Sequence, residues 1–480
     1  MQTNQPAQPG QPGQPAAPGA PAAAPAKKIY TAGALRYTTG GVVMLFIWLL
    51  WGDFCFSIFE EIFSKFLPLY MKELKASSTL TGVLTGSLGG IVNVLFMPGI
   101  SMASDRHRGR RGRRIPFLLW STPCAVGSLI LIGFTSEIGG WLHALLGGAS
   151  PGVTVAAVTI TMLCVFVAMY HFFNMVLVNL YQCLLRDVVP PALMARFLAL
   201  FRVVSTGGRF VFSWYVLPHV LTHREWVFAG VGVVYTAAFL LMCWRVREGG
   251  YPPPPEEKPP GYLSTYAVYF RECLTAPIYR NFIFMYACVT AASTCVSPFV
   301  ILFASETLKL SPEAYGRTFA WGWLAAAFAY VPFGWLCDKV SPMRVAVGAL
   351  AGLMVSWGIG YFVLQGGTSW LVYWIAVQMF PSTAWNLGFT AVTMMLFHQE
   401  KFAQLSSGLN VIGFGSSILG SFLIGLFIDL TGQDYRMIFA WSFCWFALAV
   451  VLMALVYRDW KRLGGPDHYA PPLPGKTAAA

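Results

Sequence analysis

The chain has 480 residues, of which 56% are hydrophobic and only 11% are charged. Soluble domains carry about 25% charged residues, so this composition excludes an ordinary water-soluble protein. The net charge of +12 could suggest a nucleic-acid partner, but membrane topology accounts for the positions of the Lys and Arg residues, and we expect no nucleic-acid binding.

Twelve apolar runs are long enough to cross a bilayer, since a membrane-spanning helix needs about 20 mainly apolar residues. Gly and Pro recur inside these runs, as membrane helices tolerate, and the short alternating strands of a transmembrane barrel are missing. We therefore expect an all-α membrane protein with twelve transmembrane helices. The predicted spans lie near residues 41–70, 79–103, 115–135, 152–185, 197–220, 225–244, 280–304, 314–337, 343–364, 369–397, 403–430 and 436–457.

The distribution of Lys and Arg predicts the orientation of these helices. With an even number of helices and the N-terminus inside, most of the 32 Lys and Arg residues lie on the cytoplasmic side, which is the positive-inside pattern. The opposite orientation would invert this bias. We expect both termini to be cytoplasmic and the chain to be a multi-pass protein of the inner cell membrane.

A Pro-rich stretch, Tyr251–Pro260, divides the predicted helices into six and six, because it can neither form a helix nor enter lipid. The second span ends in Asp105-Arg106 and the eighth in Asp338-Lys339. Similar charges at corresponding positions indicate an internal repeat. The expected organisation is a disordered tail over 1–36, a six-helix bundle over 37–248, a central loop over 249–278, a second six-helix bundle over 279–460 and a tail over 461–480.

The first predicted span contains four ionisable residues, Asp53, Glu60, Glu61 and Lys65. Ionisable groups inside a membrane helix are costly and by default indicate a functional site. Helical spacing places Asp53 on one face with Glu60 or Glu61, and a carboxylate there could bind and release a proton. The alternative is a static ion pair that holds helices together, with Glu61 and Lys65 pairing within their own helix.

The loop after the second predicted span carries six Arg residues in nine positions, Arg106 to Arg114. Such a basic segment binds anionic lipid and fixes topology. Asp105 is not explained by that role. A carboxylate at a helix end can contact an Arg or the amino end of a facing helix, so breaking and remaking this contact could bias one conformation of a transporter.

The residue order of this loop resembles the signature loop of the major facilitator superfamily, in the expanded form of the sucrose transporters and the wider glycoside-pentoside-hexuronide cation symporters. An Asp-Arg pair, an Arg, a Gly-Arg-Arg triplet and a Pro-Phe pair occur in that order, here as Asp105-Arg106, Arg110, Gly112-Arg113-Arg114 and Pro116-Phe117. The resemblance implies two six-helix bundles and transport by alternating access. It also implies a gating role for Asp105, Arg106, Arg110, Arg113 and Arg114, with Asp338 and Lys339 as the reduced counterpart in the second half.

The sequence departs from that group in two places. Melibiose-type members carry acidic residues for sodium in the second helix, whereas Leu80 to Ser104 contains none. Sucrose transporters of plants carry an Asp in the fourth helix, whereas the fourth span here has none before Asp187. A coupling carboxylate must therefore lie elsewhere, and a proton is favoured over sodium.

The fourth and fifth predicted spans add further polar residues. His171 could titrate or donate to a substrate hydroxyl, or it could form an interhelical hydrogen bond without a functional role. Arg202 and Arg209 lie on one face of the fifth span. By residue counting, Asp53 and Arg209 both lie near mid-bilayer, so we predict that they pair. The proton-coupling candidates are Asp53, Glu60, Glu61, His171, Arg202 and Arg209.

In the second half, Trp321, Trp323 and residues of the tenth span suit a sugar, whose hydroxyls need hydrogen bonds and whose C–H faces stack on rings. Many Trp residues instead form the ordinary interface belt of a membrane protein. Glu306 and Asp429 lie near span ends, where we expect them to be solvated. The predicted substrate-binding residues are Asn174, Gln182, Gln378, Trp385 and Asn386.

These observations leave three functional interpretations. The preferred one is a secondary active transporter that moves a sugar or glycoside by proton-coupled symport. The second is a uniporter, exchanger or exporter of another small organic solute, with a static charge cluster. The third is a transport-inactive membrane sensor or scaffold, which would usually carry an appended soluble domain, whereas short tails flank the helices here.

The sequence carries no signal of an enzyme. It contains no P-loop, and its ten Cys residues are scattered singly, without the spacing of disulfides or metal ligands. We expect no enzymatic activity, no metal and no cofactor. The expected partners of the chain, which we take to be a monomer, are a sugar-like substrate, a proton and the lipid bilayer.

Overall fold

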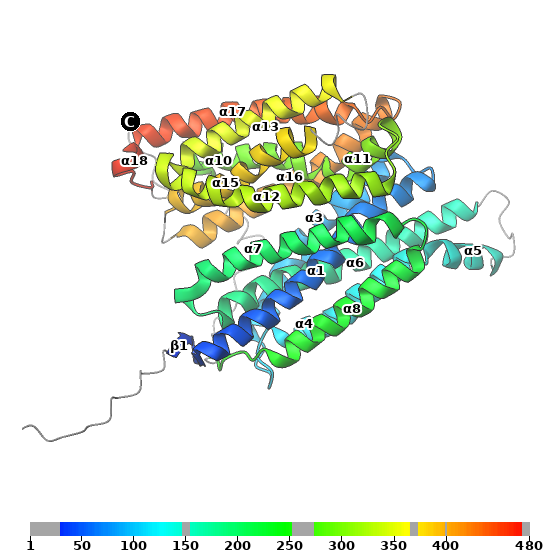
Figure 1. The fold of residues 1–480 in the computed structure, drawn as a ribbon, viewed down its shortest axis with the longest axis horizontal. Coiled ribbons are helices and arrows are strands. Elements are labelled where there is room, and N and C mark those ends of the chain that lie inside the picture. The colour runs from blue at the N-terminus through cyan, green and yellow to red at the C-terminus, as the bar shows by residue number, and fades with distance from the viewer. Residues whose placement is uncertain (1–28, 146–153, 252–272, 365–372, 399–400, 473–480) are drawn as a thin grey trace, which may run out of the picture.

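The computed structural model describes residues 29–145, 154–251, 273–364, 373–398 and 401–472. Its helices form two halves that lie side by side, with β1 and α18 at the same end of the molecule (Figure 1). The main helices of the first half are α1 (Thr39–Glu73), α2 (Ser78–Gly82), α3 (Leu88–Arg106), α4 (Ile115–Gly133), α5 (Thr135–Leu145), α6 (Val155–Val188), α7 (Met194–Val211) and α8 (Arg224–Arg245). Those of the second half are α10 (Pro277–Val289), α11 (Ser297–Leu302), α12 (Pro312–Val340), α13 (Pro342–Val363), α15 (Met379–Leu396), α16 (Phe402–Leu430), α17 (Met437–Arg462) and α18 (Gly465–His468).

The predicted all-α membrane fold is confirmed. Within the described residues, ten helices are long and apolar enough to cross a membrane. The remaining two predicted spans coincide with α7, which carries three Arg residues, and with α15. The count of twelve transmembrane helices therefore stays a prediction.

A short antiparallel hairpin of β1 (Ile29–Ala32) and β2 (Leu35–Thr38) precedes α1. The prediction of a disordered tail over residues 1–36 is thus wrong for 29–36, and residues 1–28 lie outside the described residues. Aromatic and β-branched side chains favour these strands, and Gly33 supplies the left-handed turn between them with a φ of 55°. The Thr38 hydroxyl then accepts a hydrogen bond from the Gly41 N–H and begins α1.

Several spans of the described chain contain π-helical turns, at 83–87, 212–216, 290–294, 303–307 and 373–378. Such a turn disturbs the regular backbone ladder and leaves carbonyls for other donors. His171 Nε2 lies 2.7 Å from the Leu84 carbonyl, and the Ser442 hydroxyl donates to the Ala292 carbonyl at 2.7 Å. The π turns at 83–87 and 290–294 therefore join neighbouring helices through polar contacts.

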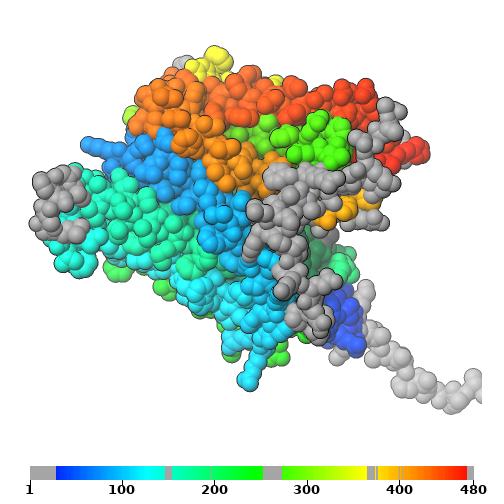
Figure 2. Space-filling view, turned by 180° about the vertical axis from the view of Figure 1, so that it is seen from behind, coloured from blue at the N-terminus to red at the C-terminus, as the bar shows by residue number. Residues whose placement is uncertain are grey.

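The two halves touch closely where α2 and α3 meet α16, and Figure 2 shows these blue and orange segments in direct contact. A Cβ atom at Gly82 would lie 2.1 Å from the Ser421 carbonyl oxygen, and one at Gly86 would lie 2.0 Å from the Ser421 hydroxyl. Gly90 faces Ile418 in the same way. The spacing of four residues places these glycines on one helix face, so the backbones of the two halves approach closely.

Asp429 joins the halves at the end of this seam. Its carboxylate accepts hydrogen bonds from the backbone N–H groups of Ser78 and Thr79, each at 2.8 Å, and from the Thr79 hydroxyl at 2.6 Å. The prediction that Asp429 is simply solvated is wrong, because the residue caps the amino end of α2 in the other half. Lys72 and Gln433 add a contact of 2.7 Å beside it.

Replacement of Gly82 by Ala should weaken the seam, because the new methyl group cannot fit against the Ser421 backbone. Overpacking of this kind costs about 1–3 kcal/mol. We expect a lower thermal unfolding temperature for Gly82→Ala in detergent. Gly127→Ala is the matched control, since a Cβ atom there meets no atom within 4 Å. An equal effect of both variants would contradict the proposed close approach.

Asp429→Asn should loosen the contact between the halves, because charge-assisted hydrogen bonds contribute about 1.5–3 kcal/mol each. Distances between spin labels at Glu73 and Leu430, in a background without native cysteines, should become longer and broader. Asp434→Asn is the control, because Asp434 caps Arg436 within its own segment. An unchanged distance distribution in Asp429→Asn would rule out a role for Asp429 in holding the halves together.

Candidate functional site

A cavity of about 200 Å³ lies between α1, α6 and α7 of the first half and α12 of the second. Five of the residues predicted to form a functional site line it: Asp53, Glu60, Gln182, Arg202 and Arg209. The cavity is therefore the place where most of the predicted membrane charges meet.

Asp53 lies in the cavity wall and is only 3% exposed. Its Oδ2 atom accepts a hydrogen bond from the Ser205 hydroxyl at 2.5 Å. The two helices approach closely one turn further on, where a Cβ atom at Gly208 would lie 2.8 Å from the Phe54 carbonyl oxygen. This register sets Asp53 level with Ser205, so the carboxylate is held by a hydroxyl.

Arg209 contacts Glu60 and Glu61 instead of Asp53. Its Nε atom lies 3.6 Å from Glu61 Oε1 and its Nη2 atom 3.7 Å from Glu60 Oε2. The predicted pairing of Asp53 with Arg209 is not formed, because Arg209 lies one turn beyond Ser205 and its long side chain reaches the next acids along α1. Both distances exceed a normal hydrogen bond, so the pairs are loose.

The cavity also presents aromatic rings and a second Arg. Arg202 lines the cavity and is exposed. The Arg209 guanidinium lies 5.1 Å from the centre of the Trp323 ring, which α12 contributes together with Tyr330. Tyr330 was not predicted, but its spacing of seven residues from Trp323 places both on one face of a helix.

Lys65 does not pair with Glu61 within α1, as one interpretation of the sequence expected. The side chain is buried, and its Nζ atom lies 5.0 Å from the centre of the Phe319 ring of α12. Glu61 Oε2 is buried without a hydrogen-bond partner in the described part of the chain. The acid thus has one oxygen directed to Arg209 and one oxygen without a hydrogen bond.

His171 and Asn174 lie outside this cavity. The contact of His171 with the Leu84 carbonyl at 2.7 Å is the interhelical hydrogen bond that the sequence left open as an alternative. A Cβ atom at Gly89 would lie 3.0 Å from His171 Nδ1, so α3 covers the other side of the ring. Asn174 Oδ1 is buried, with no hydrogen-bond partner among the described residues.

Trp323 lines the cavity, as its suitability for a sugar predicted, whereas the predicted substrate residues of the tenth span lie away from it. The Ser356 hydroxyl donates to Gln378 Oε1 at 2.6 Å in a buried contact. Trp385 is buried and packs against Phe389 with ring centres 5.3 Å apart, and Asn386 donates to a carbonyl of its own helix. Gln378 and Asn386 thus form hydrogen bonds within the second half, and Trp385 packs against a ring. Their role in substrate binding stays a prediction.

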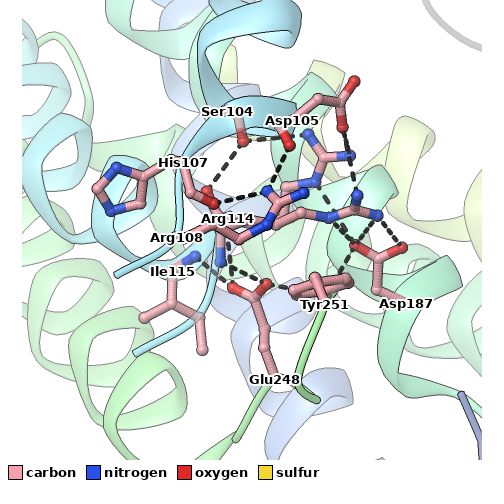
Figure 3. A network of polar contacts seen from close by, with 10 residues as sticks. Ser104, Asp105, His107, Arg108, Arg114, Ile115, Asp187, Glu248 and Tyr251 are labelled. Carbon is pink, nitrogen blue, oxygen red and sulfur yellow. Dashed lines mark hydrogen bonds and ion pairs between the residues drawn. The ribbon is translucent and has the colours of Figure 1, made fainter. Parts of the chain in front are cut away.

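The Arg-rich loop forms a network of polar contacts within the first half (Figure 3). Arg113 Nη2 lies 2.9 Å from Asp187 Oδ1 at the end of α6, and Arg114 pairs with both Asp105 and Asp187. Partial burial opposes the charge of Arg113, but the hydrogen bonds and negative charge of Asp187 outweigh it and raise the pKa of Arg113. Arg113 thus stays charged, and the two Arg residues tie α3, α4 and α6 together.

Glu248 and Tyr251, just after α8, complete this network. The Glu248 carboxylate accepts hydrogen bonds from the backbone N–H groups of Arg113, Arg114 and Ile115 at 2.6–2.9 Å and so caps the amino end of α4. The Tyr251 hydroxyl donates toward Glu248 and Asp187 at 3.0 and 3.1 Å. Neither residue was predicted from the sequence.

The gating residues implied by the family resemblance divide into several groups. Asp105, Arg113 and Arg114 find their ion-pair partners inside the first half. Arg106 and Arg110 are exposed. In the second half, Lys339 packs against the Trp335 ring, and no ion pair joins Asp338 to another described residue. Their gating role stays a prediction, and the structure gives three of them a bracing contact within one half.

Tyr251→Phe should reduce the stability of this network. Burial and the negative charges of Glu248 and Asp187 raise the pKa of Tyr251 above its ordinary value. The neutral phenol therefore stabilises the fold fully below about pH 10, and that contribution is lost as the pH rises through the raised pKa. We expect Tyr251→Phe to lower the free energy of unfolding by about 1–3 kcal/mol at neutral pH. As the pH rises above about 10, the variant should lose less stability than the native chain.

Thermal unfolding followed from pH 7 to 11 measures both effects. Tyr215→Phe is the control, since Tyr215 is 63% exposed. Identical alkaline profiles for the native chain and Tyr251→Phe would overturn the assignment.

Comparison with known proteins agrees with this architecture. Residues 282–473 match the family model of the major facilitator superfamily. Comparison with curated protein sequences gives no match.

Several crystal structures share the fold over nearly their whole length. One is a bacterial homologue of the iron transporter ferroportin, inward-facing, with 13% identity, a TM-score of 0.64 and coverage of 86% of this chain and 99% of that chain. A second is a bacterial homologue of the human lysosomal transporter Spinster, with 14% identity, a TM-score of 0.65 and coverage of 91% and 100%. A third is the nucleoside transporter NupG, with 11% identity, a TM-score of 0.60 and coverage of 86% and 98%. The chain is thus an all-α membrane protein with the major facilitator fold, and the family-model match in its second half supports the major facilitator superfamily.

Proposed function

We propose that the chain is a secondary active transporter that moves a sugar or glycoside by alternating access, coupled to proton symport. The proposal rests on the environment of Asp53. This buried carboxylate lies in the wall of the cavity between the halves and is held by the Ser205 hydroxyl, not by a cation. Asp53 can therefore take up a proton without breaking an ion pair, and the hydroxyl can either donate to the carboxylate or accept from the acid.

The lining of the cavity supports a polyhydroxylated substrate. Gln182, Arg202 and Thr206 offer hydrogen bonds, and the rings of Trp323 and Tyr330 offer surfaces on which C–H groups can stack. The volume of about 200 Å³ is below the roughly 300–1,000 Å³ of typical ligand pockets, which favours a solute the size of a monosaccharide.

The loop motif at Asp105 to Phe117 adds the resemblance to sugar symporters. The fold alone does not select a substrate, since the similar structures include transporters for iron and for nucleosides. The sugar assignment therefore rests on the cavity lining and on this loop.

We propose further that both termini are cytoplasmic, that the chain lies in the inner cell membrane and that it acts as a monomer. The excess of Lys and Arg on the side of the termini supports this orientation. In that orientation the seam of Gly82, Gly86 and Asp429 closes the outer end, which corresponds to an inward-facing arrangement.

Uptake into proteoliposomes tests the function. Labelled hexoses, sucrose and maltose are offered to the purified chain with and without an inward proton gradient. For one proton per sugar, a gradient of one pH unit can drive about tenfold accumulation. We expect Asp53→Asn to abolish accumulation while it keeps equilibration, because the amide binds no proton but preserves the shape and hydrogen-bonding capacity of the site.

Glu313→Gln is the matched control, since Glu313 is an exposed carboxylate paired with Arg317 on the same helix. It should accumulate sugar like the native chain. Equilibration without accumulation in the native chain would favour a uniporter or exchanger with static ion pairs, in which Arg209 binds Glu60 and Glu61 permanently. No uptake of any sugar would overturn the sugar assignment.

A further inference from the structure

Two apolar grooves occupy corresponding positions in the two halves. The first, of about 340 Å³, is lined by residues of α3, α4 and α6, which are the second to fourth spans of the first half. The other, of about 370 Å³, is lined by residues of α12, α13 and α15, which are the second to fourth spans of the second half. The two halves thus carry grooves of similar size, which differ in their side chains.

The first groove begins at the Arg-rich loop. His107, which directly follows α3, lines one end of the groove and points away from the ion-pair network (Figure 3). Ile100 lies on the same face of α3, about 10 Å further into the membrane by helical rise. Phe117 and Trp120 form the α4 side, and Trp120 is 63% exposed. The groove is therefore open toward lipid and has the length and polarity to hold part of an acyl chain.

Ser121 adds a polar group to this apolar surface. The residue lines the groove and is 1% exposed, and its Oγ atom has no hydrogen-bond partner in the described part of the chain. Thr122 and Ser128 of the same helix instead donate to carbonyls one turn back. A buried hydroxyl without a partner is unfavourable, and an oxygen of a bound molecule would satisfy it.

The charge at the loop end distinguishes the two grooves. The nearby acids Asp105, Asp187 and Glu248 already bind Arg113, Arg114 and backbone N–H groups. Arg110 and Arg111 are exposed, and their side chains make no ion pair or hydrogen bond to other described residues. The second groove instead ends beside Asp338, Lys339 and Arg344, where charges of both signs are present.

We propose that the first groove is a binding site for one anionic phospholipid. An acyl chain lies along Ile100, Phe117 and Trp120, an ester oxygen of the lipid accepts the hydrogen bond of Ser121, and the headgroup phosphate lies at the Arg-rich end. The second groove holds lipid without selecting an anionic headgroup. This site is separate from the cavity of Asp53, so its test does not depend on the proposed transport function.

Native mass spectrometry of the purified full-length chain tests the proposal with two lipids of identical chains, dioleoyl phosphatidylglycerol and dioleoyl phosphatidylcholine. Each surface Arg near an anionic headgroup strengthens binding about fivefold. We therefore expect the first phosphatidylglycerol to bind at least about tenfold more tightly than phosphatidylcholine. Equal affinity of the two lipids would overturn the proposal.

Two variants separate the groove from the charge. Ile100→Trp fills the groove and should lower the affinity for the first phosphatidylglycerol about tenfold. Gly348→Trp is the matched control in the second groove, where a Cβ atom meets no atom within 4 Å, and it should leave this affinity within about twofold. Arg110→Gln with Arg111→Gln should abolish the preference for phosphatidylglycerol without weakening phosphatidylcholine. Binding that is lost equally in Ile100→Trp and Gly348→Trp would contradict the assignment to the first groove.

A cross-linking measurement covers the case in which Ile100→Trp does not fold. A photoreactive benzoylphenylalanine at position 120 is illuminated in vesicles that contain one part phosphatidylglycerol and three parts phosphatidylcholine. The adducts should be predominantly phosphatidylglycerol, although it is the minor lipid. Adducts in the ratio of the bulk lipids would show that the groove makes no selection.

Discussion

The backbone contact between α2–α3 and α16 is the interaction on which the arrangement of the two halves depends. Lipid tails are as apolar as the helix surfaces, so apolar burial alone gives little drive for helices to associate in a membrane. The absence of side chains at Gly82, Gly86 and Gly90 lets the two halves approach closely enough for extensive van der Waals contact. Across the same surface, the Ser87 hydroxyl donates to the Ile418 carbonyl at 2.6 Å. Asp429 completes the contact. Because such close packing tolerates no small displacement, the seam favours two discrete states, formed and broken.

The cavity lined by Asp53 contains charged side chains that have different kinds of partner. Asp53 is held by a hydroxyl, Glu60 and Glu61 share the loosely placed Arg209, and Lys65 lies against an aromatic ring. A group held by a neutral partner can change its charge with less rearrangement than a group in an ion pair. The geometry therefore separates a candidate for proton binding from residues that balance charge around it.

The sequence was sufficient to predict the membrane helices, since a long apolar run has few alternatives to a helix in lipid. It also indicated that Asp53, Arg202 and Arg209 share a region, because helical spacing and depth can be counted. It could not give the partner of each charge. Residue counting predicted a similar depth for Asp53 and Arg209. In the structure, packing at Gly208 sets Asp53 level with Ser205 and directs Arg209 to Glu61.

Other features depend on contacts between distant segments, which one sequence does not contain. The π turn at residues 83–87 leaves the Leu84 carbonyl for His171, and no local pattern marks it. Asp429 lies near a helix end, a position that usually means solvent. Its true partners, Ser78 and Thr79, are about 350 residues away along the chain. Gln378 was predicted to bind a sugar hydroxyl, but its amide oxygen already accepts a hydrogen bond from the Ser356 hydroxyl.

Tyr251 gives the connection between the two halves a fixed starting point. It is bound to Glu248 and Asp187 and lies against the guanidinium of Arg113, with 4.1 Å between the guanidinium carbon and the ring centre. The Glu248 that Tyr251 contacts also accepts hydrogen bonds from the first backbone N–H groups of α4. A change at Tyr251 is therefore transmitted to the ends of α4, α6 and α8 together.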